Sequence, residues 1–175
     1  VPLLRDRIDE EAAEIVRLTK EQKHALDYCQ ENLRVGVEGG AGTGKTILAM
    51  EKARRLVADG KSVRFLCFNK PLADSLNEEA EGFIATSFHE LCHEMALETE
   101  LGFNVPKKQE EVQQFWNEEA PELLMKALEL APRKRYDAVI IDEGQDFKEN
   151  WWAAILGLLA DRDSSHLYVF HDPNQ

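Results

Sequence analysis

A glycine-rich segment of eight residues limits the folds open to this chain more than any other part. It reads Gly39-Gly40-Ala41-Gly42-Thr43-Gly44-Lys45-Thr46 and fits G-x-x-x-x-G-K-[ST], the phosphate-binding P-loop. The glycines permit a tight turn that brings backbone N–H groups up to phosphate oxygens. Lys45 places a positive charge near the β- and γ-phosphates, and the Thr46 hydroxyl can ligate Mg²⁺. The pattern predicts a site for a nucleotide or another phosphate.

The residues on both sides of this loop support the assignment. Residues 33–37 are β-prone and enter the loop, and residues 46–57 are rich in helix formers and leave it. Such a helix points its positive dipole end at the bound anion. An ordinary glycine-rich turn is the alternative, and the strand–loop–helix context disfavours it.

Length and composition indicate one globular domain. The chain has 175 residues, of which 43% are hydrophobic and 31% charged. No apolar run approaches the roughly 20 residues that a membrane helix needs, and no signal peptide is recognisable. The three cysteines, Cys29, Cys67 and Cys92, are widely spaced, which predicts buried reduced thiols in a cytoplasmic protein with no membrane partner.

The charge and the two ends of the chain lead to further expectations. A net charge of −12 argues against a protein that binds nucleic acid by itself, although it leaves room for a local basic groove. Because the chain starts at Val1 and stops after a strand-like run, we expect a fragment of a longer protein.

Strand and helix patterns alternate along the chain. Apolar strand patterns occur at residues 63–68, 82–86, 137–141 and 167–170, with helical patterns between them. This alternation predicts an α/β fold with a doubly wound parallel sheet. Residues 1–18 are predicted to form a linker or packing helix. Residues 99–135 are predicted to form a small helical insertion, with two acidic helices separated near Pro121.

An acidic pair follows the most apolar strand. Asp142 and Glu143 come directly after residues 137–141, at the sheet edge where ligands of such folds bind. Asp142 could hold Mg²⁺ through water, and Glu143 could orient or deprotonate the water that attacks the γ-phosphate. A solvated acidic strand end is the alternative.

A second local pattern lies upstream of the P-loop. Thr19 and Gln22 fit the capping box S/T-x-x-E/Q that begins a helix. On local sequence alone, a purely capping Gln22 and a Gln22 that contacts a ligand are equally favoured.

In this order, the motifs resemble the first RecA-like domain of superfamily 1 DNA helicases of the UvrD/Rep type. The resemblance covers residues 18–175: residues 18–26 resemble the Q motif, residues 39–46 match motif I, and residues 142–146 match motif II. Residues 68–73 and 86–89 resemble motifs Ia and Ib, and residues 172–175 resemble the start of motif III. The amino-acid sequence of residues 68–73 is most similar to that of helicase-like proteins with nuclease-related domains.

The resemblance implies an ATP- and Mg²⁺-dependent motor that moves on single-stranded DNA. It implies residues 19–175 as a RecA-like P-loop domain, whose second RecA-like partner domain is absent here and should carry the arginine fingers. The implied catalytic residues are Lys45, Glu143 and Gln175, and the implied Mg²⁺ ligands are Thr46 and Asp142. The residues implied to bind the nucleotide are Gln22, Gly39, Gly40, Ala41, Gly42, Thr43, Gly44, Lys45, Thr46 and Gln145. The residues implied to contact DNA are Phe68, Asn69, Thr86, Phe88 and His89.

Three other functions are alternatives to this one. His89 and His93 form a literal H-E-x-x-H, which could bind Zn²⁺ in a metalloprotease, but no clear third ligand follows. A small-molecule kinase is disfavoured by Gln145, Asp146 and Gln175. A regulatory nucleotide-binding module without translocase activity is the main alternative to the motor.

Overall fold

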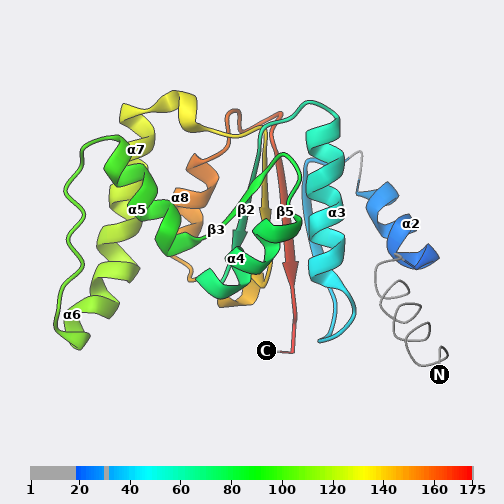
Figure 1. Cartoon of the computed structure of the whole chain (residues 1–175), viewed down its shortest axis with the longest axis horizontal. Coiled ribbons are helices and arrows are strands. Elements are labelled where there is room, and N and C mark those ends of the chain that lie inside the picture. Colours follow the sequence, from blue (N-terminus) through cyan, green and yellow to red (C-terminus); the bar gives the residue numbers. More distant parts are fainter. Residues whose placement is uncertain (1–18, 30–31, 175) are drawn as a thin grey trace, which may run out of the picture.

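A five-stranded sheet forms the centre of the computed structural model, which describes residues 19–29 and 32–174 (Figure 1). All of its neighbouring strands are parallel, in the order β1-β5-β4-β2-β3. The predicted α/β class and parallel sheet are confirmed. The helix predicted over residues 1–18, and Gln175, lie outside the described residues. The strands are β1 (Arg34–Glu38), β2 (Val63–Cys67), β3 (Ile84–Ser87), β4 (Ala138–Ile141) and β5 (His166–His171).

Alternating side chains of the central strands divide the core into two faces. Phe65, Ile140 and Tyr168 belong to one buried cluster, whereas Leu66 and Val139 belong to the other. Every residue of β2 and β4 is buried, as expected for central strands of a parallel sheet that is covered on both sides.

Helices cover both faces, so the domain has three layers (Figure 1). Helices α2, α3 and α4 contribute to the cluster around Phe65, and α5, α7 and α8 contribute to the cluster around Leu66. Because all strands run the same way, the loops that follow them gather at one edge of the sheet. The helices are α2 (Lys20–Tyr28), α3 (Lys45–Ala58), α4 (Lys70–Glu79), α5 (Phe88–Glu98), α6 (Gln109–Gln114), π-helix η1 (Phe115–Glu119), α7 (Ala120–Leu130), 3₁₀ turns η2 (Pro132–Lys134) and η3 (Gly144–Asp146), and α8 (Trp151–Gly157).

Local capping fixes where two of these helices begin. The Thr19 hydroxyl accepts a hydrogen bond from the Gln22 backbone N–H at 3.2 Å, and the Ser87 hydroxyl accepts one from Glu90 N–H at 3.2 Å. In both helices the N3 side chain returns a bond to the capping residue, which completes a capping box. The helix start predicted at Thr19 is confirmed.

The insertion differs from the prediction of two helices separated near Pro121. Helices α6, η1 and α7 follow one another without a break, and the backbone N–H of Ala120 bonds to the carbonyl of Phe115 in a π-turn. Pro121 lies in the first turn of α7, and because the helical run continues before it, its missing N–H leaves the Asn117 carbonyl without a helical partner. The π-turn therefore lets a single helical run pass through the proline.

The π-turn and Pro121 leave two helix carbonyls without backbone partners, and the side chains of Asn150 and Trp151 bind them. The indole N–H of Trp151 donates to the Trp116 carbonyl at 2.9 Å. The side-chain amide of Asn150 donates to the Asn117 carbonyl, whose helical partner would have been the absent N–H of Pro121. The π-turn is thus held by the segment that follows residues 142–146.

The cysteine prediction agrees with the structure. Cys29, Cys67 and Cys92 are buried and carry free thiols. Within the described ranges, no helix is both long and apolar enough to cross a lipid bilayer.

Candidate active site

The loop between β1 and α3 has the backbone that its glycines require. Gly42 and Gly44 have φ angles of 76° and 81°, in the left-handed region that glycine adopts without strain. A Cβ atom at Gly39 would lie 2.7 Å from the Thr43 hydroxyl oxygen, so a side chain there would displace Thr43. That hydroxyl closes the loop by donating to the Gly40 carbonyl at 2.8 Å. The loop can therefore present backbone N–H groups at the N-terminus of α3.

Lys45 is folded back onto this loop. Its amine donates to the carbonyls of Gly39 at 2.8 Å and Gly40 at 3.0 Å, and only 8% of the residue is exposed. The same Nζ atom lies 4.0 Å from Oδ2 of Asp172, a buried carboxylate at the end of β5. A phosphate entering the loop would therefore compete with these carbonyls for the Lys45 amine.

Thr46 and Asp142 meet across the site. The Thr46 hydroxyl, in the first turn of α3, donates to Oδ2 of Asp142 at 2.7 Å. Asp142 follows β4 and is fully buried. Burial raises the pKa of its carboxyl, while the Thr46 hydrogen bond and the nearby Lys45 charge oppose that rise. A hydroxyl and a carboxylate oxygen are hard oxygen donors, so these two residues fit Mg²⁺.

Glu143 is held in an unusual backbone conformation. Its φ of 54° and ψ of 48° are left-handed, which is uncommon for a residue other than glycine. The amide of Gln145 donates to Oε2 of Glu143 at 2.6 Å and accepts from the Asp172 backbone N–H at 3.0 Å. Gln145 was predicted to bind the nucleotide; here it orients the Glu143 carboxylate and ties it to the end of β5.

Gly144 lies where η3 passes close to β5. A Cβ atom at Gly144 would lie 2.6 Å from Cγ1 of Val169 and 3.4 Å from the Phe170 carbonyl oxygen. We expect Gly144→Ala to lower the free energy of unfolding by about 1–3 kcal/mol, because the branched Val169 side chain must move away from the added methyl group. Urea unfolding would measure this, with Gly102→Ala as the control, since its nearest neighbour is 3.8 Å away. Equal losses in the two variants would contradict the prediction.

Gln22 connects α2 to the P-loop. Its side-chain oxygen accepts from Thr19 N–H at 2.8 Å, and its side-chain nitrogen donates to the Thr43 carbonyl at 2.8 Å. The capping role is confirmed. An amide carries two donor hydrogens and two acceptor lone pairs, so each end retains one further bond for a ligand. Capping and contact with a nucleotide base are therefore compatible.

Comparison with known proteins agrees with this geometry. A family described as an AAA domain matches residues 22–175. This chain belongs to that family. The family match and the parallel sheet agree with the predicted resemblance to the first RecA-like domain of superfamily 1 helicases. No curated protein is matched.

Two solved structures resemble this AAA domain over most of its length. It resembles Bacteroides Pif1 bound to ssDNA, with 20% identity and a TM-score of 0.47 over 89% of this chain and 32% of that one. It also resembles a structure described as the basis for DNA unwinding at forked dsDNA by two coordinating Pif1 helicases. There the identity is 19% and the TM-score 0.49, over 89% of this chain and 33% of that one. The domain spans about a third of the length of these Pif1 chains.

The residues predicted to contact DNA follow or close two strands of the AAA domain. Phe68 follows β2 and is 44% exposed, so its ring is available for stacking. Asn69 caps α4, accepting from Leu72 N–H at 3.0 Å. Thr86, in β3, is half-buried, and its hydroxyl has no hydrogen-bond partner among the described residues.

Phe88 and His89 lie deeper than the prediction assumed. Phe88 is 1% exposed and stacks on Trp151 with ring centres 4.2 Å apart. The His89 ring lies 4.0 Å from the Trp116 ring, and burial lowers its pKa. The Phe88 side chain lies in the core against Trp151 of α8 and has no surface for DNA. His89 keeps a partly exposed ring.

The H-E-x-x-H alternative gains no support. His93 packs its ring against Phe103 at 5.3 Å, while His89 packs against Trp116. In the part of the chain that the structure describes, no three His, Cys, Asp or Glu side chains come together as metal ligands.

The sequence interpretation missed the Asp172 carboxylate as part of the site. Asp172 is 3% exposed, beside Lys45, and its backbone N–H binds Gln145. The available signal was its position directly after an apolar strand, which is the same signal that identified Asp142 after β4.

Proposed function

We propose that this AAA domain binds ATP with Mg²⁺ and is the nucleotide-binding part of a DNA helicase or translocase. The observation that carries the proposal is the 2.7 Å bond between Thr46 of the P-loop and Asp142 after β4, beside the Lys45 amine. This contact supports the proposal, because it joins the first turn of α3 after the P-loop to the acidic end of β4 at one edge of the sheet.

The arrangement supports hydrolysis rather than transfer to another acceptor. Bound Mg²⁺ would supply positive charge to the phosphate oxygens. Lys45 would leave the loop carbonyls to bind the β- and γ-phosphates. Glu143, oriented by Gln145, would accept a proton from water as its oxygen attacks the γ-phosphorus and the bond to ADP breaks. The products are ADP and inorganic phosphate.

Single-stranded DNA is proposed to cross the ends of β2 and β3. Phe68, Asn69 and Thr86 follow or close these strands; β2 is the neighbour of β4 in the sheet, and β3 is the neighbour of β2. An exposed aromatic ring offers a stacking surface to bases of any sequence. ATP turnover that rises with single-stranded DNA would support this part of the proposal. A rate of ATP turnover that does not change when single-stranded DNA is added would favour a regulatory nucleotide-binding module.

Binding of the nucleotide should depend on Lys45. Lys45→Ala is expected to weaken binding of a fluorescent ATP analogue with Mg²⁺ by about 10–100-fold, because a charge-assisted hydrogen bond contributes roughly 1.5–3 kcal/mol. The matched control is Lys108→Ala, since Lys108 is exposed on the insertion and pairs there with Glu111. Equal affinity of the wild type and Lys45→Ala would refute ATP binding at this loop.

A further inference from the structure

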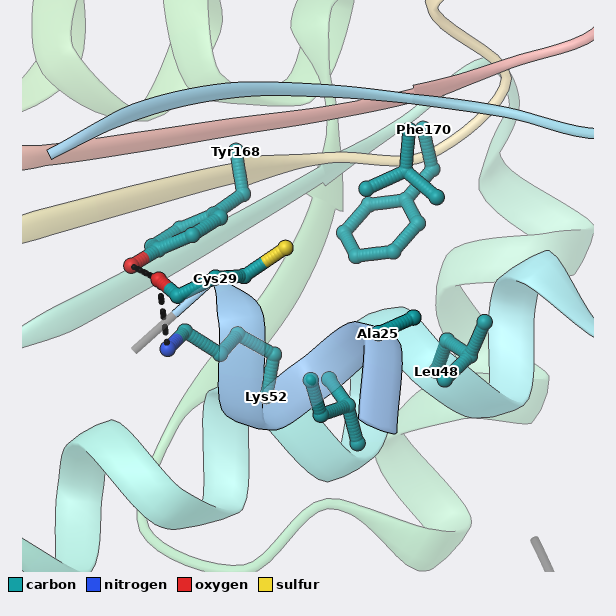
Figure 2. Close-up of a pocket in the computed structure, with 8 residues that line it drawn as sticks. Ala25, Cys29, Leu48, Lys52, Tyr168 and Phe170 are labelled. Atoms are coloured by element: carbon teal, nitrogen blue, oxygen red, sulfur yellow. Dashed lines mark hydrogen bonds between the residues drawn. The ribbon is translucent and has the colours of Figure 1, made fainter. Parts of the chain in front are cut away.

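Lys52, on α3, is a buried lysine that the proposed chemistry does not use. It is 3% exposed, and burial lowers the pKa of its amine. Its Nζ atom lies 3.4 Å from the carbonyl oxygen of Cys29 and 4.5 Å from the centre of the Tyr168 ring (Figure 2). A buried amine keeps such partners because an unpaired one would be costly.

Tyr168, on β5, approaches the same carbonyl from the sheet. Its hydroxyl oxygen lies 2.9 Å from the carbonyl oxygens of Cys29 and Asn32, and 3.2 Å from Nδ1 of His166. Burial raises the pKa of Tyr168 to about 12, so the phenol keeps its proton and donates. Figure 2 shows the Tyr168 oxygen and the Lys52 amine both reaching the Cys29 carbonyl.

These contacts fall on the C-terminal end of α2. Cys29 is the C-cap of α2, and the last carbonyls of a helix have no partner within it. A positive charge is favourable at this negative end of the helix dipole, yet the last turn of α2 carries no basic residue. Lys52 supplies that charge from the neighbouring helix.

Apart from the hydrogen bond of Gln22 to the P-loop, few contacts in the described residues hold α2. A helix of nine residues is too short to be stable by itself. Among its side chains that the structure describes, Leu26 is the buried one. The ion pair between Asp27 and Arg55 is largely exposed, and such pairs contribute little. The position of α2 therefore depends on the anchor at Cys29.

The space beside Lys52 does not suggest a ligand. The adjoining cavity has a volume of about 10 Å³ and is lined mainly by apolar side chains such as Leu48 and Phe170. That volume holds one water molecule at most. The amine of Lys52 therefore acts within the protein.

We propose that Lys52 and Tyr168 anchor the C-terminal end of α2 and thereby position Gln22, so that they determine the preference for adenine. The opposite end of α2 carries Gln22, which touches the P-loop at the Thr43 carbonyl. An amide can pair with both N6–H and N7 of adenine, whereas guanine has an acceptor in place of N6–H. This inference rests on the proposed ATP binding.

The test compares ligands with and without the base. Lys52→Met and Tyr168→Phe keep most of the buried volume and remove the polar contacts to Cys29. Each is expected to reduce the ratio of ATP to GTP affinity about fivefold, the worth of roughly one hydrogen bond, with unchanged tripolyphosphate affinity. Lys23→Met, on the exposed side of α2, is the control and should leave the ratio unchanged.

A double-mutant comparison separates positioning from general damage. If Lys52 acts through Gln22, adding Lys52→Met to Gln22→Ala should reduce the ratio no further. The inference is overturned if the ratio of ATP to GTP affinity is unchanged in both Lys52→Met and Tyr168→Phe, or if their affinity for tripolyphosphate falls as much as that for ATP. It is overturned as well if the losses caused by Lys52→Met and Gln22→Ala add in the double variant. It is also overturned if Gln22→Ala keeps the wild-type ratio, because Gln22 is then only a cap. Failure of the proposed function gives a different result: wild-type binding of ATP would not depend on Lys45.

Discussion

Residues 1–175 are expected to hydrolyse ATP about 10³–10⁵ times more slowly than a longer chain that contains a second RecA-like domain. The proposed reason is a missing arginine at the γ-phosphate. An arginine finger supplied from another domain is worth about this factor, which is roughly 4–7 kcal/mol of activation free energy. In the described residues, positive charge reaches the phosphate loop from Lys45 on one side.

The arginines in the described part of the chain either bind other groups or lie away from the P-loop. Arg34 and Arg64 lie in the first half of their strands, at the edge of the sheet opposite the P-loop, and bind groups there. Arg54 and Arg55, in the second half of α3, bind Glu79, Glu51 and Asp27. The remaining three are Arg133 and Arg135, which precede β4, and Arg162, which precedes β5.

The measurement is steady-state phosphate release from residues 1–175 and from the longer chain, each with and without single-stranded DNA. Lys45→Ala in the longer chain is the background control, because it should remove turnover that depends on this site. DNA-stimulated turnover near 1 s⁻¹ by residues 1–175, an ordinary enzyme rate, would mean that the site is complete within one domain. The arginine argument would then be wrong.

Glu143→Gln should separate ATP binding from hydrolysis. In the longer chain we expect turnover to fall about 10²–10⁴-fold, the usual contribution of a general base. The glutamine keeps the size of the side chain and its hydrogen-bonding ability, but it cannot take a proton from water. Binding of ATP with Mg²⁺ should change little, because the contact of Thr46 with Asp142 and the amine of Lys45 remain.

The control for this variant is Glu149→Gln, an exposed residue before α8. Single-turnover measurements at saturating ATP would separate the chemical step from nucleotide binding and product release. A Glu143→Gln protein with wild-type single-turnover hydrolysis would show that another group activates the water. Loss of ATP binding together with turnover would point to a structural role for Glu143.

Local patterns in the sequence were enough to predict much of this domain. The P-loop pattern predicted the turn between β1 and α3, because Gly42 and Gly44 must adopt positive φ angles. The apolar run before Asp142 predicted β4, because a strand buried on both faces carries no polar positions. The capping box at Thr19 involves neighbours three residues apart, so sequence spacing alone revealed it.

Contacts between distant segments decided the rest. Phe88 was predicted to face DNA, but its partner Trp151 lies 63 positions further along the chain, beyond the reach of a local pattern. The unbroken run through Pro121 depends on Asn150, which binds the carbonyl that the proline leaves free. Lys52 appears in sequence as an ordinary polar position of an amphipathic helix. Only the tertiary structure brings its amine to the carbonyl of Cys29, the C-cap of α2. The pairing of β1 with β5 brings Tyr168 to the same carbonyl.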